Sequence, residues 1–152
     1  MTNIYVAGFY FHRTKVLLVK KTRPNWQAGL MNAIGGRVEN GENPAQAMYR
    51  EFWEETKIKE QNWQLFCCER GPDYIVYFFR CELAPEFDRP VNLSKNDVGE
   101  ELIWESADYS EWNYIRPMVG NLRWLLPLAC DWRKFESVDV VTSDAISTRP
   151  SW

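Results

Sequence analysis

Three glutamates near residue 50 are the residues best suited to chemistry in this sequence. Glu51, Glu54 and Glu55 are separated by steps of three and one, so on an α-helix Glu54 and Glu55 flank Glu51 on one face. Like charges at this spacing destabilise a helix, and carboxylates near its C-terminal end oppose the helix dipole. A divalent cation would reverse both penalties. The alternative is a solvated acidic face without a ligand.

The nature of that cation follows from which ligands are absent nearby. All candidate ligands are oxygens, which favours Mg²⁺, with Mn²⁺ as a substitute, over zinc. The chain has one histidine, His12, and no Cys-x-x-Cys pair among its four cysteines. These counts exclude a His-rich zinc site and an HExxH metalloprotease. A net charge of −3 also argues against binding duplex nucleic acid, but not against binding a small phosphorylated ligand.

A helix must present these glutamates, and the sequence indicates where it begins. Pro44 suits the first helical position and Asn43 can cap it, so we expect a helix running to Lys57 or Ile58. Its apolar stripe is expected to contain Ala45, Met48, Phe52 and Thr56.

β-strands are expected on both sides of this helix. Apolar runs predict a β-hairpin of residues 5–11 and 16–19, and further strands at 62–69, 74–83 and 102–105. A second helix is expected around residues 119–132. The elements together predict one α/β or α+β domain over residues 1–136, followed by a poorly ordered tail, 137–152.

The segment from Gly36 to Ile58 resembles the Nudix box, the signature of hydrolases that cleave nucleoside diphosphates linked to another group. The matching positions are Gly36, Glu42, Arg50, Glu51, Phe52, Glu54, Glu55 and Ile58. The one departure is Lys57, which stands where the family usually has a glycine that terminates the helix in a left-handed conformation. The resemblance implies the Nudix fold, an α/β/α sandwich around a mixed β-sheet.

The resemblance also implies roles for the box residues. Glu51, Glu54 and Glu55 would bind Mg²⁺ together with the backbone carbonyl of Gly35. Arg50 would hold a carboxylate, since Glu54 lies four residues further along the helix.

A carboxylate must then accept a proton from the attacking water, and the sequence leaves two places for it. It lies either in the box, as Glu54 does, or in the segment 94–104, where Glu100 is preferred over Glu101. Glu42 would brace the junction between the loop and the helix.

Substrate contacts are expected on three further segments. Lys21 ends an apolar strand and is a candidate phosphate contact, with a solubilising charge as the alternative. The stretch that contains Asn32 resembles enzymes that remove oxidised purine nucleotides, in which an Asn just before the glycines reads the base. Asn121 is a candidate second base contact. Trp26, Trp112 or Trp124 would stack on the base, unless these rings are part of the core.

The sequence therefore predicts a Mg²⁺-dependent hydrolase that cleaves a nucleoside triphosphate, such as 8-oxo-dGTP, to monophosphate and pyrophosphate. One alternative is a nucleoside-diphosphate-sugar or dinucleotide pyrophosphatase. Another is a non-catalytic nucleotide-binding module, which the intact glutamates disfavour. No signal peptide or membrane span is expected, which indicates a cytoplasmic protein with a small-molecule nucleotide as partner. The sequence leaves open whether it is a monomer or a homodimer.

Overall fold

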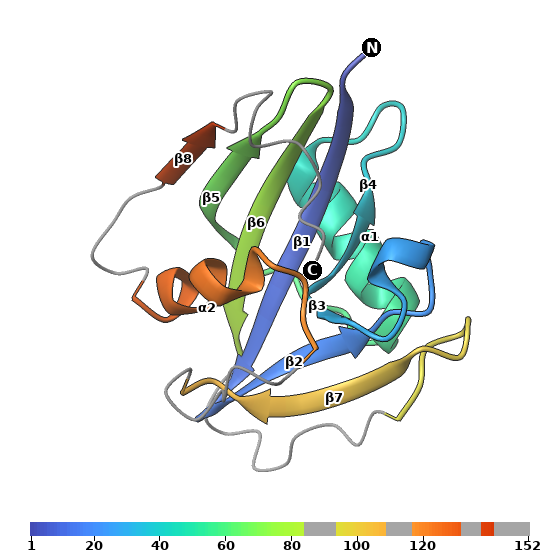
Figure 1. Ribbon diagram of the computed structural model, residues 1–152, viewed down its shortest axis with the longest axis vertical. Helices are drawn as coiled ribbons and strands as arrows, with labels where there is room; N and C mark the ends of the chain where they lie inside the picture. Colours follow the sequence, from blue (N-terminus) through green and yellow to red (C-terminus); the bar gives the residue numbers. More distant parts are fainter. Residues whose placement is uncertain (84–93, 109–116, 132–137, 142–152) are drawn as a thin grey trace.

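Eight strands form one mixed β-sheet in a computed structural model of the chain, which describes residues 1–83, 94–108, 117–131 and 138–141 (Figure 1). The main strand order is β3-β2-β1-β6-β5-β8, with β4 paired to β1 and β7 paired to β2. The strands are β1 Asn3–His12, β2 Lys15–Lys20, β3 Met31–Asn32, β4 Ile34–Arg37, β5 Gln64–Arg70, β6 Tyr74–Glu82, β7 Glu101–Ser106 and β8 Val138–Val141. The helices are the 3₁₀ turn η1 Asn25–Gln27, α1 Pro44–Thr56 and α2 Leu122–Cys130.

The central strand β1 pairs along both of its edges. It runs parallel to β6 along nearly its whole length and antiparallel to β4 and β2 on the other edge. The predicted hairpin is present, but its turn is only Arg13 and Thr14, so both strands are longer than expected.

Two apolar cores lie on opposite faces of the sheet, one under each helix. Side chains of a strand point alternately to the two faces. Phe9 and Phe11 therefore pack with α2, whereas Val6 and Tyr10 pack with α1. Helices on both faces of a mixed sheet confirm the predicted α/β/α sandwich (Figure 1).

The helix α1 begins as its sequence predicts. Pro44 occupies the first turn, and Asn43 and Gln46 form a reciprocal capping box with two hydrogen bonds of 2.9 Å. The buried side chains are Ala47, Met48, Phe52 and Thr56. Ala45 is exposed, so its expected place in the apolar stripe is wrong and Ala47 takes it.

Several strands were missed or misplaced at the sequence level. β3 and β4 are short and contain the glycine pair, which gives no β-propensity signal. β5 begins at Gln64 rather than at residue 62, and α2 begins at Leu122 rather than at residue 119.

Four residues of the segment that we expected to be a tail also lie in a strand. Val138–Val141 pairs in parallel with β5, so these four residues belong to the sheet. The remainder of 137–152 lies outside the described residues. Across the residues described, no helix is long and apolar enough to cross a membrane.

Candidate active site

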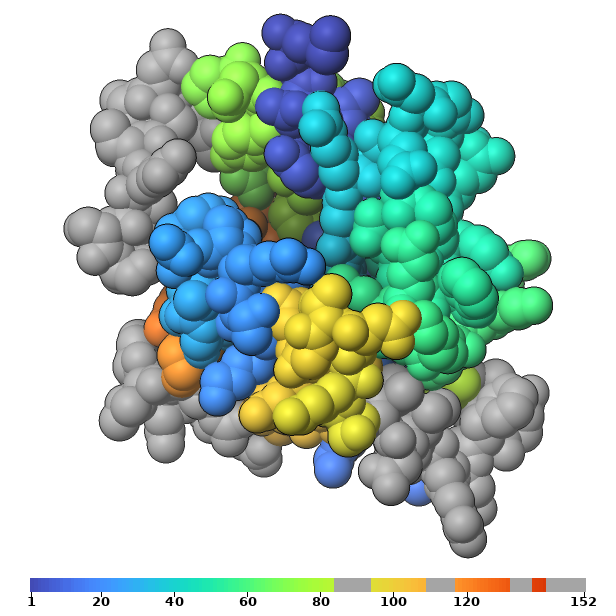
Figure 2. Space-filling view, turned by 90° about the vertical axis from the view of Figure 1, so that its right-hand side faces the viewer, coloured from blue at the N-terminus to red at the C-terminus, as the bar shows by residue number. Residues whose placement is uncertain are grey.

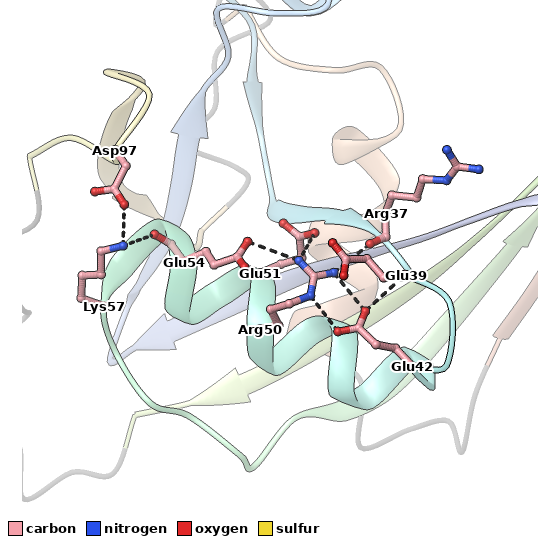
Figure 3. A network of polar contacts seen from close by, with 8 residues as sticks. All are labelled: Arg37, Glu39, Glu42, Arg50, Glu51, Glu54, Lys57 and Asp97. Atoms are coloured by element: carbon pink, nitrogen blue, oxygen red, sulfur yellow. Dashed lines mark hydrogen bonds and ion pairs between the residues drawn. The ribbon is translucent and has the colours of Figure 1, made fainter.

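The guanidinium of Arg50 is the centre of a network of carboxylates on the exposed side of α1 (Figure 3). Its Nε and Nη2 atoms donate to the two oxygens of Glu42 at 2.7 and 3.0 Å. Nη2 also donates to the carbonyl oxygen of Arg37 at 2.9 Å, which fixes the loop before α1 to the helix. The bonds from Arg50 hold the pKa of Glu42 below its usual range. Glu42 thus braces the junction between loop and helix, as its position in the box implied.

The same guanidinium reaches two of the three glutamates that could bind a cation. Nη1 donates to Glu51 at 2.8 Å and to Glu54 at 3.2 Å. Burial raises the pKa of Glu51, although the bond from Arg50 opposes the shift. Glu54 is 49% exposed, whereas the side chain of Glu51 is 15% exposed. Glu54 is therefore the carboxylate of this pair that solvent reaches.

The glycine pair on β4 lets the backbone approach both β1 and Glu51 closely. A methyl group on Gly35 would overlap the carbonyl of Val6, and one on Gly36 would overlap the carboxylate of Glu51. Only residues without a side chain fit at these two positions. Gly36 thereby places the backbone of β4 directly against the first glutamate of α1.

Glu55 points away from Arg50 and towards a second group of polar residues. Its Oε2 accepts a hydrogen bond from Asn96 at 3.4 Å. Burial raises the pKa of Glu55 to about 7, with nearby Lys21 opposing the shift and Glu100 and Glu51 adding to it. Glu55 therefore lies where three negative groups and one positive group come together.

Glu100 is held on all sides within this second group. Its side chain is 2% exposed. Oε1 accepts from the backbone N–H and the hydroxyl of Thr22 at 2.9 and 3.2 Å, and Oε2 accepts from Lys21 and Asn96 at 3.1 Å each. Burial alone would raise the pKa of Glu100, but these bonds outweigh it and the pKa is lowered. Its oxygens thus have four donors, and Glu101 begins β7 on the exposed side.

Three segments that are distant in sequence meet around these residues. The loop after β2 carries Lys21, the segment 94–100 carries Asn96 and Glu100, and α1 carries the box glutamates. Figure 2 shows the loop after β2 in blue, the segment from residue 94 in yellow and α1 in green, side by side on one face.

Lys57 ends α1 in the conformation that the family usually assigns to glycine. Its φ is 62°, in the left-handed region, and its N–H bonds to the carbonyl of Trp53 at 2.8 Å. The side chain bends back so that Nζ donates to the carbonyl of Glu54 at 2.9 Å and to Asp97 (Figure 3). The departure from the box therefore keeps the helix end and adds a link to the segment 94–100.

The chemistry of this donor set fits Mg²⁺ better than its present arrangement does. Carboxylate oxygens are the ligands that Mg²⁺ prefers, and burial with mutual repulsion penalises their charges. Within the described ranges, however, no three acidic, His or Cys side chains form a ready cation site. Glu51 and Glu54 are turned towards Arg50 instead.

The two asparagines expected to read a base lie on neighbouring segments. Met31 bonds to Pro117 and Val119 through the backbone, at 2.8 and 3.0 Å, which brings β3 beside the start of α2. Asn32 accepts from Ala33 at 2.8 Å and donates to Gln27 at 3.1 Å.

Asn121 offers a different pattern. Its Nδ2 lies 3.5 Å from Glu69, and its buried Oδ1 has no partner among the described residues. Trp26 and Trp124 are exposed, at 57% and 38%, so neither ring is a core residue. Trp112 lies outside the described residues.

Sequence reasoning missed the polar residues that hold the expected ones. Thr22, Gln27, Glu69 and Asn96 are neither acids of the box nor near it in sequence. Asn96 lies in the segment that was examined for a proton acceptor. A buried asparagine four residues before a buried glutamate leaves no sequence signal.

Comparison with known proteins assigns this arrangement to a family. The model of the NUDIX domain matches residues 1–113, most of the chain, so the chain belongs to the NUDIX domain family. It is a pyrophosphohydrolase that acts on phosphoric anhydride bonds, and enzymes of this family generally use a divalent metal. No curated protein matches the chain.

Solved structures share the fold at low sequence identity. The MutT protein from Bacillus halodurans is 18% identical with a TM-score of 0.67, over 95% of this chain and 93% of that one. An ADP-ribose pyrophosphatase from Streptococcus suis is 18% identical with a TM-score of 0.64, over 91% and 99%. The NUDIX domain of Shewanella oneidensis NrtR, solved with ADP ribose, is 16% identical with a TM-score of 0.65, over 89% and 90%.

Proposed function

We propose that residues 1–136 form one catalytic domain that cleaves a nucleoside or deoxynucleoside triphosphate to the monophosphate and pyrophosphate in the presence of Mg²⁺. The observation that carries the proposal is the contact of one guanidinium, Arg50, with Glu42, Glu51 and Glu54. One positive charge does not balance three carboxylates. The excess negative charge, with Glu55 partly buried beside it, is what a bound cation would offset.

In the proposed mechanism, Glu51, Glu54, Glu55 and the carbonyl of Gly35 hold the ion. When bound, Mg²⁺ neutralises charge on the bridging phosphates and lowers the pKa of a coordinated water. Arg50 orients Glu51 and Glu54 through its Nη1 atom.

Glu54 is the better proton acceptor of the two that the sequence left open. It is half exposed, with a single printed contact from Arg50 to its carboxylate. Glu100 would first have to release one of the donors on its two oxygens. We therefore assign proton acceptance to Glu54, and to Glu100 the anchoring of Lys21 beside the phosphates.

Base recognition is proposed for Asn32 and Asn121. Asn121 has a free acceptor in Oδ1, and Asn32 has one N–H left after its bond to Gln27. A donor and an acceptor suit a purine edge, which is the basis for proposing an oxidised purine such as 8-oxo-dGTP. The exposed ring of Trp26 or Trp124 is available to stack on that base.

A second candidate function has support from the solved structures. The titles of two of them name ADP-ribose, as substrate or as bound ligand, at TM-scores equal to those of the MutT proteins. A nucleoside-diphosphate-sugar or dinucleotide pyrophosphatase is therefore retained as the alternative. A binding module without activity is disfavoured, since all box acids are present.

A nucleotide panel tests the proposal. Wild-type protein and Glu54→Gln are incubated with Mg²⁺ and nucleoside triphosphates, 8-oxo-dGTP, ADP-ribose and dinucleotides, and products are separated by chromatography. We expect pyrophosphate from triphosphates, and a loss of at least about 100-fold in Glu54→Gln. Turnover of diphosphate-linked substrates alone would favour the second candidate. If wild type and variant bind nucleotide but are both inert, the binding module is correct.

A further inference from the structure

The segment 94–100 forms a tight turn around a buried asparagine. The N–H of Asn96 bonds to the carbonyl of Glu100 at 3.0 Å, and the N–H of Gly99 bonds to the carbonyl of Asn96 at 3.0 Å. Gly99 has a φ of 80°, which favours glycine. Asn96 is only 9% exposed although it lies in a connecting segment. A buried polar side chain in such a turn needs partners, and its partners define what it does.

The side-chain amide of Asn96 makes contacts of two different kinds. Its Oδ1 accepts the N–H of Glu100 at 2.9 Å, a bond that shapes the turn. Its Nδ2 donates to Glu100 Oε2 at 3.1 Å and to Glu55 Oε2 at 3.4 Å. One NH₂ group therefore joins two carboxylates that would otherwise repel each other, one from the turn and one from α1. No acidic side chain could replace it, because an ionised carboxylate only accepts hydrogen bonds.

The contact with Asn96 determines which oxygen of Glu55 is left over. Oε2 is engaged, whereas Oε1 has no hydrogen-bond partner among the described residues. Glu55 turns away from Arg50, which orients Glu51 and Glu54. Asn96 is thus the counterpart of Arg50 on the other side of the glutamate trio.

The neighbouring residue makes a comparable link without burial. Asp97 pairs with Lys57 at the end of α1, but the two side chains are 74% and 54% exposed. Exposed pairs contribute little, since water screens them. Asp97 is therefore a matched control: it joins the same turn to the same helix without touching Glu55.

We propose that Asn96 is a positioning residue that fixes the carboxylate of Glu55 for cation binding through its Nδ2 donor. This role rests on the proposed function, in which Glu55 is a ligand of the ion. It assigns to the turn 94–100 a part in the reaction that needs no contact between Asn96 and the substrate.

Two variants separate the two kinds of contact. Asn96→Ala removes both. Asn96→Asp keeps an oxygen for the N–H of Glu100 but loses the donor to Glu55. We expect kcat for dGTP with Mg²⁺ to fall at least tenfold in both, KM to change less than threefold, and Asp97→Ala to stay within twofold of wild type. Mn²⁺ binding without nucleotide, followed by electron paramagnetic resonance, should weaken at least threefold in Asn96→Ala.

Two results would overturn the inference. One is wild-type kcat in Asn96→Asp, which would leave only the shape of the turn. The other is an equal loss in Asp97→Ala, which would indicate general loosening. If Asn96→Ala fails to fold, Asn96→Asp still decides. If the wild type hydrolyses no nucleotide but Asn96→Ala weakens Mn²⁺ binding, the proposed function fails and the positioning role remains.

Discussion

At the scale of single residues, Gly36 and Glu51 are coupled by direct contact. A methyl group on Gly36 would overlap the carboxylate of Glu51, so Gly36→Ala should displace that side chain from Arg50. We expect kcat to fall at least about tenfold, with a stability cost of about 1–3 kcal/mol from overpacking. Because both changes act through one carboxylate, Gly36→Ala added to Glu51→Gln should lower kcat little further. Steady-state kinetics of the two single variants and the double variant check this; fully multiplicative losses would contradict it.

Glu42 makes a second residue-scale prediction, about stability against pH. The bonds from Arg50 lower its pKa in the folded state below the model value of 4.5. The stabilisation is therefore fully present above that value and is lost as pH falls through the lower, folded-state pKa. Glu42→Gln should cost about 1 kcal/mol at neutral pH and nothing near pH 3, roughly. Urea unfolding of both proteins across this range measures the gap, and a gap independent of pH would contradict the assignment.

At the scale of elements, the end of α1 depends on Lys57 holding a left-handed conformation, with φ of 62°. A residue with a Cβ pays about 1 kcal/mol for it, whereas glycine does not. Lys57→Gly and Lys57→Ala both lose the contacts of Nζ with Glu54 and Asp97. The glycine variant should therefore be more stable than the alanine variant by about 1 kcal/mol. Thermal and urea unfolding compare them; equal stabilities would show that the helix end relaxes without cost.

The elements also show what the sequence could and could not predict. The start of α1 was predictable because Asn43, Pro44 and Gln46 act locally through caps. β3 and β4 were missed because their pairing depends on β1 and β2, strands remote in sequence. The box spacing identified the glutamates and Arg50. The contacts of Glu100 and Asn96 were not predictable, since three distant segments create them.

At the scale of the whole molecule, the fold and the candidate site are built from different residues. The two cores consist of apolar side chains from the strands, α1 and α2. The carboxylates lie outside both cores, around Arg50 and Asn96. Burial of apolar surface dominates folding. The sheet and its helices should therefore form whether or not the site holds an ion.

Removal of divalent metal tests this separation. Excess chelator should abolish hydrolysis, while the far-ultraviolet circular dichroism spectrum stays unchanged. The melting temperature should fall by no more than a few degrees, because an ion stabilises only by RT ln(1 + [L]/Kd), about 2.7 kcal/mol at 100 times Kd. Phe52→Ala is the matched opposite: Phe52 is fully buried between α1 and the sheet, and its truncation should cost about 3–5 kcal/mol with or without metal. A large loss of secondary structure on chelation would mean that the ion is part of the fold, and that the two cores alone do not hold the sandwich together.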